Sequence, residues 1–435
     1  MAILAGISLS YGPAGAAPGV QAPLTASEAQ ALSTNVTDKV IVVFQNQLGT
    51  IPDNTKNEAA RSAAVAGVQA PVVHELGLTD AQNVKSIQVV NAISATVSPG
   101  EAQRLAANPD VSEVVKDEPI PVADSASMTT VGTANVASGN APDLSGGGAL
   151  KAACAPSGQV QLDPQAIETI HAASQSGKGA NAQALGYTGA GVKVGFIADG
   201  LDTKDPDFIR SNGQKVFVDY QDFSGTGTKA PTSGAEAFLD ASSIAAQGLH
   251  TYDVAGYGSG LPAPCLIRVL GVAPGASLVG LNVFGSSNEA FNSVFLEAIN
   301  YAVGVDHVNV LNESFGSNPF PDTASLDLTR MADDAAVAAG VTVTVSSGDA
   351  GVTNTIGSPA TDPAVISAGA STTYRGYAQT GIGGINLKGV KGWLNNNISG
   401  LSSGGFAQDG TTVDVVAPGD LNWALCSPPL RRYAD

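Results

Sequence analysis

Two acidic residues four positions apart are the first feature of the sequence that could carry out chemistry. Glu236 and Asp240 lie in the stretch EAFLDASSIAAQ, which predicts a helix over residues 236–247. Residues four apart project from one face of a helix, so the two carboxyl groups are expected to be neighbours. Two close carboxylates cannot both ionise cheaply, so one holds a proton and the pair can act in acid as a base and its orienting partner. The alternative is that acidic residues merely favour the positive end of the helix dipole.

The predicted helix belongs to a region in which strands and helices alternate. From about Tyr187 onward, apolar runs bounded by Gly, Pro and Asn alternate with helical stretches such as 290–303 and 326–339. The runs are VKVGFIA, SLVGLNVF, VNVLNESF, VTVTVSS and AVISAGAS. Continuous apolar strands between helices predict an α/β fold, a parallel doubly wound sheet with helices on both faces. In such sheets the active site lies in the loops that leave the carboxyl ends of the strands.

Three other regions precede this one, which we take as residues 187–435. Residues 38–122 contain strand-like runs and a helical segment that begins at Pro99, and they predict a small α+β domain of βαββαβ, ferredoxin-like type. Residues 123–186 are rich in Ser, Ala, Gly and Thr and predict a linker open to cleavage, with a short helix near 163–174. Residues 1–37 are signal-like but lack a basic start, so a disordered N-terminus is an equal alternative.

Composition excludes several classes of protein. The chain has 435 residues, of which 43% are hydrophobic and 13% charged, and this composition does not suit disorder. The formal net charge of −18 argues against nucleic acid as a partner. Since no apolar run is long enough to span a bilayer, no membrane partner is expected. The three cysteines, Cys154, Cys265 and Cys426, are an odd number, so we expect one partner to lie outside this sequence. Their spacing predicts no zinc site, and no residue is assigned as a metal ligand.

Ordered strings in residues 187–435 carry a resemblance to a known family. From Gly186 to about Asp420 this region resembles the catalytic domain of subtilases, the subtilisin-like serine peptidases. Residues 38–122 are similar to the inhibitory propeptide of the same family, most clearly in NAISATVSPGEAQRLAANPDVSEVVKDE. The strings of the catalytic region are TGAGVKVGFIADGLD, GVAPGASLVGLNVFG, NESFGS, VTVTVSSGDAG, GSPATDPAVISAGAS and VDVVAPGD. The resemblance implies a precursor of a secreted serine peptidase.

Subtilases use an Asp, a His and a Ser, and the aspartate ends the first strand of the sheet. Here Ala198 occupies that place and Asp199 follows one residue later. A shift of one residue turns a strand side chain to the opposite face of the sheet. Asp199 can therefore act as the catalytic aspartate only if a bulge or turn redirects its side chain. The alternative for Asp199 is a turn-forming residue before Gly200.

The family's histidine lies at the start of a helix, and the most similar string in this sequence is HTYDVAG, which begins with His250. Glu236 and Asp240 lie on the better helix, and their spacing resembles the sedolisins, acid-acting relatives that carry Glu and Asp in place of His. The resemblance therefore implies catalytic roles for Glu236 and Asp240. One alternative is that His250 is the base, and another is that neither the carboxyl pair nor His250 is catalytic. In SSGDAG, Asp349 replaces the usual oxyanion-binding Asn, as in sedolisins, and must be protonated to donate a hydrogen bond.

The nucleophile and the substrate-binding strand complete the comparison with the family. The serine should lie in a Gly-Thr-Ser string, which occurs nowhere in the chain, so we expect a fragment that stops before its nucleophile. The resemblance assigns Ser314, Phe315 and Gly316 to an edge strand that pairs with extended substrate. The alternative for these three residues is the end of a core strand.

Two hypotheses for function follow. The first is a secreted, extracellular serine endopeptidase precursor that hydrolyses proteins or peptides at acidic pH, with its own propeptide as intramolecular inhibitor. The second is a catalytically inactive subtilase-like protein that binds extended peptides. The resemblance allows calcium as a cofactor, although no dense acidic loop marks a site, and no other cofactor is expected.

Overall fold

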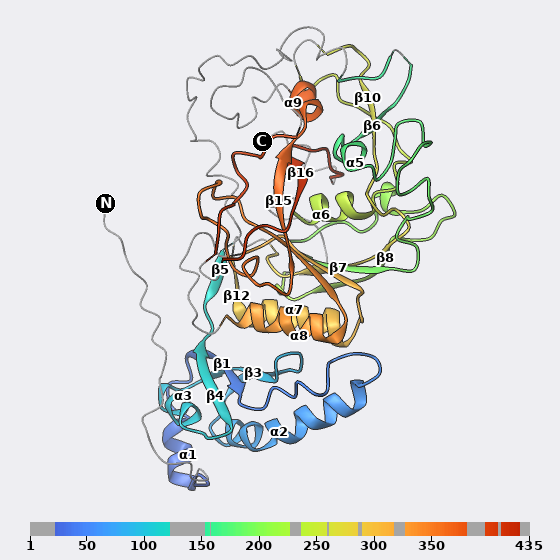
Figure 1. Ribbon diagram of the computed structural model, residues 1–435. Coiled ribbons are helices and arrows are strands. Elements are labelled where there is room, and N and C mark those ends of the chain that lie inside the picture. Colours follow the sequence, from blue (N-terminus) through green and yellow to red (C-terminus); the bar gives the residue numbers. More distant parts are fainter. Residues whose placement is uncertain are drawn as a thin grey trace. The chain divides into compact units, whose positions relative to one another are not determined.

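The structure is a computed structural model, shown as a ribbon in Figure 1. Contacts group the chain into two compact units, which are taken separately below. The first comprises Met1–Ile120, Phe291–His307 and Met331–Gly340, and the second comprises the rest. Residues 1–21 and 122–152, with much of the signal-like stretch and of the expected linker, lie outside the described residues. The structure describes 22–121, 153–156, 158–226, 236–258, 261–285, 289–316, 327–380, 396–407 and 410–426.

The first unit contains the expected small α+β domain. Its four strands form an antiparallel sheet in the order β2-β3-β1-β4, and helices follow the first and third strands along the chain. This is the ferredoxin-like arrangement, so the predicted βαββαβ domain is confirmed. The elements are β1 (Asp38–Phe44), α2 (Glu58–Leu78), β2 (Gln82–Ile87), β3 (Ala92–Val97), α3 (Pro99–Ala106) and β4 (Val111–Lys116).

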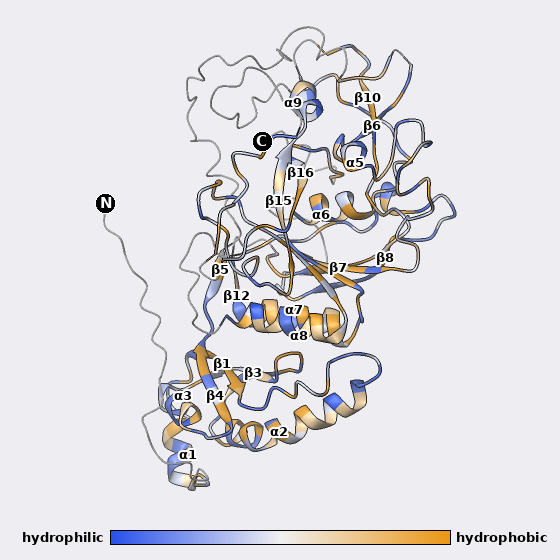
Figure 2. Cartoon of the chain, viewed as in Figure 1, coloured by the Kyte–Doolittle hydropathy of each residue, from blue (hydrophilic) through white to orange (hydrophobic). Residues whose placement is uncertain are grey.

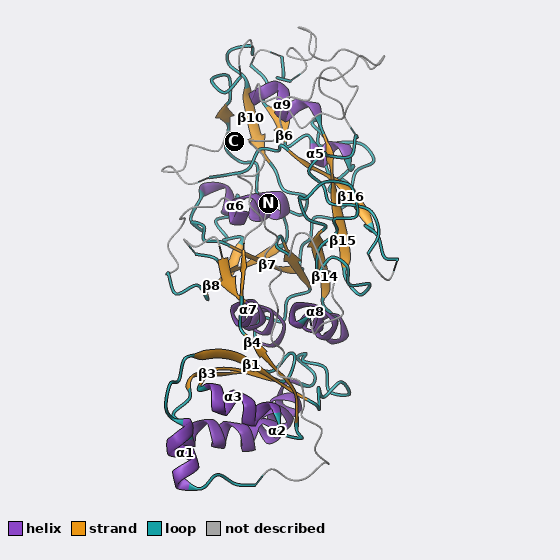
Figure 3. Cartoon of the chain, turned by 90° about the vertical axis from the view of Figure 1, so that its left-hand side faces the viewer, coloured by secondary structure: helices purple, strands orange, loops and turns teal. Residues whose placement is uncertain are grey.

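Helices α2 and α3 cover one face of this sheet (Figure 3). Strand β1 is rich in β-branched residues, which favour extended backbone, and its hydrophobic run is orange in Figure 2. Phe44 at its end is fully buried in a cluster with Leu105 of α3, and such a side chain contributes about 1.5–3 kcal/mol by leaving water. Helix α3 begins where Ser98 Oγ accepts a hydrogen bond of 3.2 Å from Glu101 N, with Pro99 in the first turn.

A shorter helix precedes this domain, in the segment expected to be signal-like or disordered. Helix α1 (Ala26–Leu32) is capped by Thr25, whose side chain and backbone exchange hydrogen bonds with Glu28 as a capping box.

Helix α7 (Asn292–Gly304) belongs to the first unit and contacts the small domain directly. Asn300 Oδ1 accepts hydrogen bonds from the backbone N–H groups of Gln88 (2.7 Å) and Val89 (2.9 Å). Ser293 donates from its backbone N (2.9 Å) and its Oγ (2.7 Å) to the buried carboxylate of Asp117. Most of α8 (Leu328–Ala339) also falls in this unit.

The second unit is built on a seven-stranded sheet in the order β16-β15-β14-β13-β7-β11-β8, and every registered pair in it is parallel. The predicted α/β class with a large parallel subtilisin-like sheet is confirmed. Helix α6 (Glu236–Ala245) packs against β7 and β11. The strands are β7 (Lys193–Ala198), β8 (Phe217–Asp222), β11 (Ser277–Asn282), β13 (Val310–Glu313), β14 (Thr342–Ser346), β15 (Ile366–Thr372) and β16 (Val415–Asp420).

Strand β7 is the point at which the sheet changes direction. The chain runs from β7 to β8 and β11 on one side, and then continues with β13, β14, β15 and β16 on the other. The loops after β7 and β13 therefore leave the same edge of the sheet and diverge, which opens a crevice for ligands in folds of this kind. Residues that follow these strands are placed to meet there.

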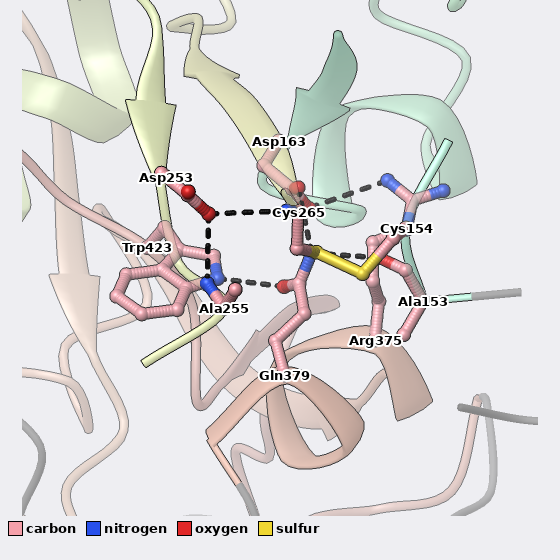
Figure 4. Close-up of a disulfide and its surroundings, with 9 residues drawn as sticks. All are labelled: Ala153, Cys154, Asp163, Asp253, Ala255, Cys265, Arg375, Gln379 and Trp423. Carbon is pink, nitrogen blue, oxygen red and sulfur yellow. Dashed lines mark hydrogen bonds and ion pairs between the residues drawn. A yellow bond between two sulfur atoms is a disulfide. The ribbon is translucent and has the colours of Figure 1, made fainter. Parts of the chain in front are cut away.

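The second half of the expected linker, from Ala153 onward, is part of the second unit, and a disulfide joins Cys154 to Cys265 (Figure 4). The sequence left the pairing of the cysteines open, and Cys426 is exposed and outside this bond. Here β6 (Gln161–Asp163) pairs with β10 (Leu266–Val269), which also pairs with β9 (Tyr252–Asp253). The predicted short helix is α5 (Ala166–Thr169), and a three-residue 3₁₀ helix follows β7 at Pro206–Phe208.

A buried polar network surrounds this disulfide. Asp163, only 1% exposed, accepts hydrogen bonds from Arg375 (3.3 Å) and from Gln379 (3.1 Å), both on α9 (Tyr374–Thr380). Burial raises the pKa of Asp163 to about 6, although Arg375 acts in the opposite direction. Gln379 also bonds the carbonyl of Ala153 and the indole N–H of Trp423, as Figure 4 shows. Among the described residues, no helix is long and apolar enough to cross a membrane.

Candidate active site

Asp199 is the first residue after β7 and is 5% exposed. The chain bends at this position, so the alternation of side chains along the strand no longer decides where Asp199 points. Its Oδ1 accepts a hydrogen bond of 2.8 Å from the backbone N of Ala237. The turn that the sequence required for re-aiming Asp199 is therefore present, and the carboxylate caps the first turn of α6.

Glu236 and Asp240 lie one helical turn apart in α6, as expected. Helix α6 presents Asp240 as a buried residue and Glu236 as a half-buried one. Oδ1 of Asp240 accepts a hydrogen bond of 2.7 Å from the hydroxyl of Ser314, the residue that follows β13. The parallel sheet thus brings a residue from after β7, two from α6 and one from after β13 to a single place.

The electrostatics of the pair are those of two acids competing for ionisation. Burial, followed by the charge of Asp199, raises the pKa of Glu236 to about 7, and Asp349 acts in the same direction. Burial and then the charge of Glu236 raise the pKa of Asp240 well above its ordinary value. The hydrogen bond from Ser314 partly offsets both shifts because it favours the charged form. Below neutral pH, the pair therefore holds at least one proton.

Asp349 lies in the loop after β14 and is half-buried. The segment 401–403 holds this loop on both sides of Asp349. Ser403 N donates to Gly348 O (2.8 Å), and Ala350 N donates to Ser403 Oγ (3.1 Å). Gly351 N donates to Leu401 O (2.9 Å). These bonds fix the backbone that carries Asp349 close enough to Glu236 for its charge to raise the pKa of that residue.

His250, the alternative base, lies in another environment. Its Nδ1 is 3.0 Å from Oδ1 of Asp207, and its side chain is 51% exposed. The same carboxylate of Asp207 is fully buried and also accepts from the backbone N of Leu249 (2.8 Å) and the hydroxyl of Tyr252 (3.0 Å). Asp207 thus holds a loop together, and His250 is one of its partners.

Ser314, Phe315 and Gly316 form no edge strand in the described residues, in contrast to the expectation. Strand β13 is paired on both sides, with β7 and β14, and ends at Glu313 before these three residues begin. Phe315 is 2% exposed, and a Cβ on Gly316 would lie 2.7 Å from the carbonyl oxygen of Ser358. The physical reason is that a central strand has both edges occupied, so only the irregular continuation can offer backbone groups to a partner.

Two residues that sequence reasoning did not single out take part in the site. Asn312 donates from Nδ2 to Ser314 Oγ (3.1 Å), and Thr344 donates from Oγ1 to Asn312 Oδ1 (3.2 Å). Asn312 and Ser314 are two positions apart, so their side chains project to the same face of the sheet. Thr344 lies opposite Asn312 on the neighbouring strand β14. A signal was present in the sequence: the apolar run that became β13 ends in three consecutive polar residues, Asn312, Glu313 and Ser314.

The arrangement has the parts of an acid–base device. A carboxyl pair that shares one proton can accept a second proton and return it, and a hydrogen-bond donor beside it can stabilise negative charge on a substrate oxygen. Within the described residues, no group of three or more His, Cys, Asp or Glu side chains is arranged to hold a metal ion. The calcium prediction stays a prediction.

Comparison with known proteins finds similarity to subtilisins and a related extracellular protease. Subtilisin E of Bacillus subtilis (strain 168) is 31% identical over 242 residues, which are 54% of this chain and 48% of that protein. The subtilisin of Bacillus pumilus is 30% identical over 242 residues, which are 54% of this chain and 66% of that protein. The minor extracellular protease Vpr of Bacillus subtilis (strain 168) is 30% identical over 236 residues, 52% of this chain and 27% of that protein.

The chain therefore spans about half the length of subtilisin E, one of the curated relatives that it matches. The model of the subtilase family, Peptidase S8, matches residues 189–434, which is more than half of the chain. The match covers all the strands of the seven-stranded parallel sheet and the residues gathered at its edge. On these grounds, the chain belongs to the subtilase family.

Proposed function

We propose that this chain is part of the precursor of a secreted serine endopeptidase that hydrolyses proteins at acidic pH, with Glu236 and Asp240 in place of the usual histidine. The observation that carries the proposal is the buried carboxyl pair at the carboxyl edge of the parallel sheet, with Ser314, Asp199 and Asp349 around it. The family's known relatives supply the reaction class, since subtilisins are among the proteins to which this chain is similar.

In the proposed reaction a serine hydroxyl attacks the peptide carbonyl carbon while its proton passes to the Glu236 carboxylate. The C–N bond then breaks as the proton of Glu236 is delivered to the leaving amine, which leaves an ester on the serine. Water hydrolyses that ester by the same proton transfers. Asp240 keeps the proton that the pair already shares, and a protonated Asp349 donates to the oxyanion.

The serine is proposed to lie outside the printed sequence, because the family's Gly-Thr-Ser string does not occur among its 435 residues. Asp199 is proposed to hold the first turn of α6, and through it Glu236, by its bond to Ala237 N. The proposal for Ser314, Phe315 and Gly316 is that their backbone pairs with extended substrate, supported by their position directly beyond β13.

The small domain of the first unit is proposed to be the inhibitory propeptide. Its support is the set of contacts with α7, in which Asn300 accepts from two backbone N–H groups and Asp117 accepts two hydrogen bonds from Ser293. Lys85 Nζ adds a contact of 2.7 Å to Glu297. Extracellular location is supported by the Cys154–Cys265 disulfide, because such bonds persist in oxidising compartments.

The test is the pH profile of peptide hydrolysis by the complete protein, together with labelling by a fluorophosphonate probe, which reacts with an activated serine. The proposal requires labelling and a maximum of kcat/KM below neutral pH. A maximum above neutral pH would eliminate the carboxylate mechanism while leaving the peptidase class intact.

The second candidate is an inactive subtilase-like protein that binds extended peptides. It is favoured by one observation, the lack of a Gly-Thr-Ser string in a chain whose other family strings are in order. Absence of both turnover and probe labelling, with retained binding of an extended peptide, would select this candidate.

A further inference from the structure

A chain of three hydrogen bonds leads from the interior of the sheet to the carboxyl pair. Thr344 Oγ1 donates to Asn312 Oδ1 at 3.2 Å, Asn312 Nδ2 donates to Ser314 Oγ at 3.1 Å, and Ser314 Oγ donates to Asp240 Oδ1 at 2.7 Å. The link to the carboxyl oxygen is the shortest of the three.

The direction of each bond follows from the atoms involved. An amide NH₂ can only donate, so the oxygen of Ser314 must accept from Asn312, and the single hydroxyl proton of Ser314 is left for Asp240. Oδ1 of Asp240 is therefore an acceptor whether Asp240 is ionised or protonated. The other oxygen, Oδ2, is buried and has no hydrogen-bond partner among the described residues. It is the atom that remains to carry a proton.

From this geometry we propose that Ser314, held by Asn312 and Thr344, is a positioning residue that confines the proton of the carboxyl pair to Oδ2 of Asp240. Glu236 then stays the carboxylate that accepts the proton of the nucleophile. The inference deepens the proposed function and rests on it for its catalytic meaning. Its structural content, the location of one proton, stands apart from any turnover.

Loss of the Ser314 hydroxyl has two consequences for the pair. The Asp240 proton can occupy either oxygen, including Oδ1, and Asp240 loses a hydrogen bond that favours its charged form. The other acidic groups that raise the pKa of the pair are Asp199, which follows β7, and Asp349, from the loop after β14, and the substitution leaves both in place. The pair is therefore expected to hold its proton to higher pH.

The experiment is an infrared titration of the 435-residue protein with isotope-labelled aspartate, which follows the carbonyl band of a protonated aspartic acid without any substrate. In Ser314→Ala this band is expected to persist to a pH about one unit higher than in the unaltered protein. The band should also move to higher frequency, because Oδ1 has lost its donor. Asn312→Leu is expected to move the titration in the same direction by a smaller amount.

Two controls separate this role from general loosening of the fold. Ser314→Thr keeps a hydroxyl and is expected to restore the titration. Ser242→Ala removes another buried hydroxyl from α6, one that accepts from Leu425 N at 2.9 Å, and is expected to leave the band in place. An unchanged titration in Ser314→Ala, or equal shifts in Ser314→Ala and Ser242→Ala, would overturn the inference. A shift in an otherwise inactive complete protein would support the inference and refute the proposed peptidase.

Discussion

Ser314 and Asp240 are 74 positions apart in the chain, and the hydroxyl of the first donates a hydrogen bond of 2.7 Å to the carboxylate of the second. The contact joins the loop after β13 to the middle of α6, which the parallel sheet brings to one edge. Through it, a residue that the family resemblance places at the substrate also touches the acid–base pair. Predictions about catalysis and stability follow from this site and from the buried charges elsewhere.

Removal of either acid of the pair should disable the proposed peptidase. Glu236→Gln and Asp240→Asn keep the shape of each side chain but remove its ability to accept or share a proton, so kcat/KM of the complete protein should fall by about 10²–10⁴. Asp202→Asn is the matched control, since Asp202 is an exposed carboxylate a few residues beyond Asp199. Steady-state kinetics on a peptide substrate measures the effect, and near-normal activity in Glu236→Gln would rule out its role as base.

Asp349 should limit activity at higher pH because only its protonated form can donate to an oxyanion. Asn donates at every pH, so Asp349→Asn is expected to keep activity and to extend the upper limb of the pH profile. Asp349→Ala has no donor and should lower kcat by about 10²–10³ at all pH values. Equal losses in the two variants would show that Asp349 acts by some means other than donation.

Glu101 should make the stability of the first unit depend on pH. It is fully buried, and burial, followed by the charge of Glu75, raises its pKa to about 7 from 4.5. A raised pKa means that the folded state binds the proton more tightly than the unfolded state. The resulting stability is complete below about pH 4.5 and is lost as the pH rises through about 7.

Glu101→Gln removes this titration, so the variant should gain up to about 3 kcal/mol relative to the unaltered protein near pH 8. Thermal unfolding measured at about pH 4 and about pH 8 gives the comparison. Glu289→Gln, an exposed change of the same kind, serves as control. A difference between Glu101→Gln and the unaltered protein that is independent of pH would contradict the prediction.

Arg375 should be essential for the stability of the second unit. Its guanidinium donates to Leu162 O (2.6 Å), Asp163 (3.3 Å) and Glu168 (2.8 Å), and Asp163 is buried. Arg375→Met leaves that carboxylate without its cation and should cost about 3–5 kcal/mol of unfolding free energy. Urea unfolding followed by the fluorescence of Trp423 reports on this region, because Trp423 bonds Gln379 in the same network.

The control is an exposed ion pair in the first unit. Lys116 and Glu118 have side chains that are 71% and 52% exposed, so Lys116→Met should change stability by less than about 1 kcal/mol. The double variant Asp163→Asn with Arg375→Met should recover part of the loss, since no buried charge is left unpaired. A cost in Arg375→Met no larger than in Lys116→Met would mean that the network adds little.

Much of the fold followed from local patterns in the sequence. The apolar runs that became β7, β11, β13, β14 and β15 were recognisable because fully buried parallel strands need continuous apolar residues. The domain βαββαβ and the start of α3 at Pro99 also followed from local pattern and capping chemistry. The proximity of Glu236 to Asp240 followed from helix geometry alone, since residues four apart lie on the same face of a helix.

The sequence could not determine where those elements aim their polar side chains. The direction of the Asp199 side chain depends on a bend after β7 and on a hydrogen bond from the backbone N of Ala237, 38 positions away. The pairing of Cys154 with Cys265 spans 111 positions, and His250 turned to Asp207, which no family string contains.

The sequence by itself therefore determined the fold class, the family resemblance and the carboxyl pair, because each depends on neighbours within a few residues or on strings in order. Only the tertiary structure decided that Ser314, Asn312 and Thr344 reach this pair and that segment 153–186 is fastened to the second unit. The physical reason is that a hydrogen bond or disulfide requires atoms within a few ångströms, and only packing of the whole sheet fixes such distances between remote residues.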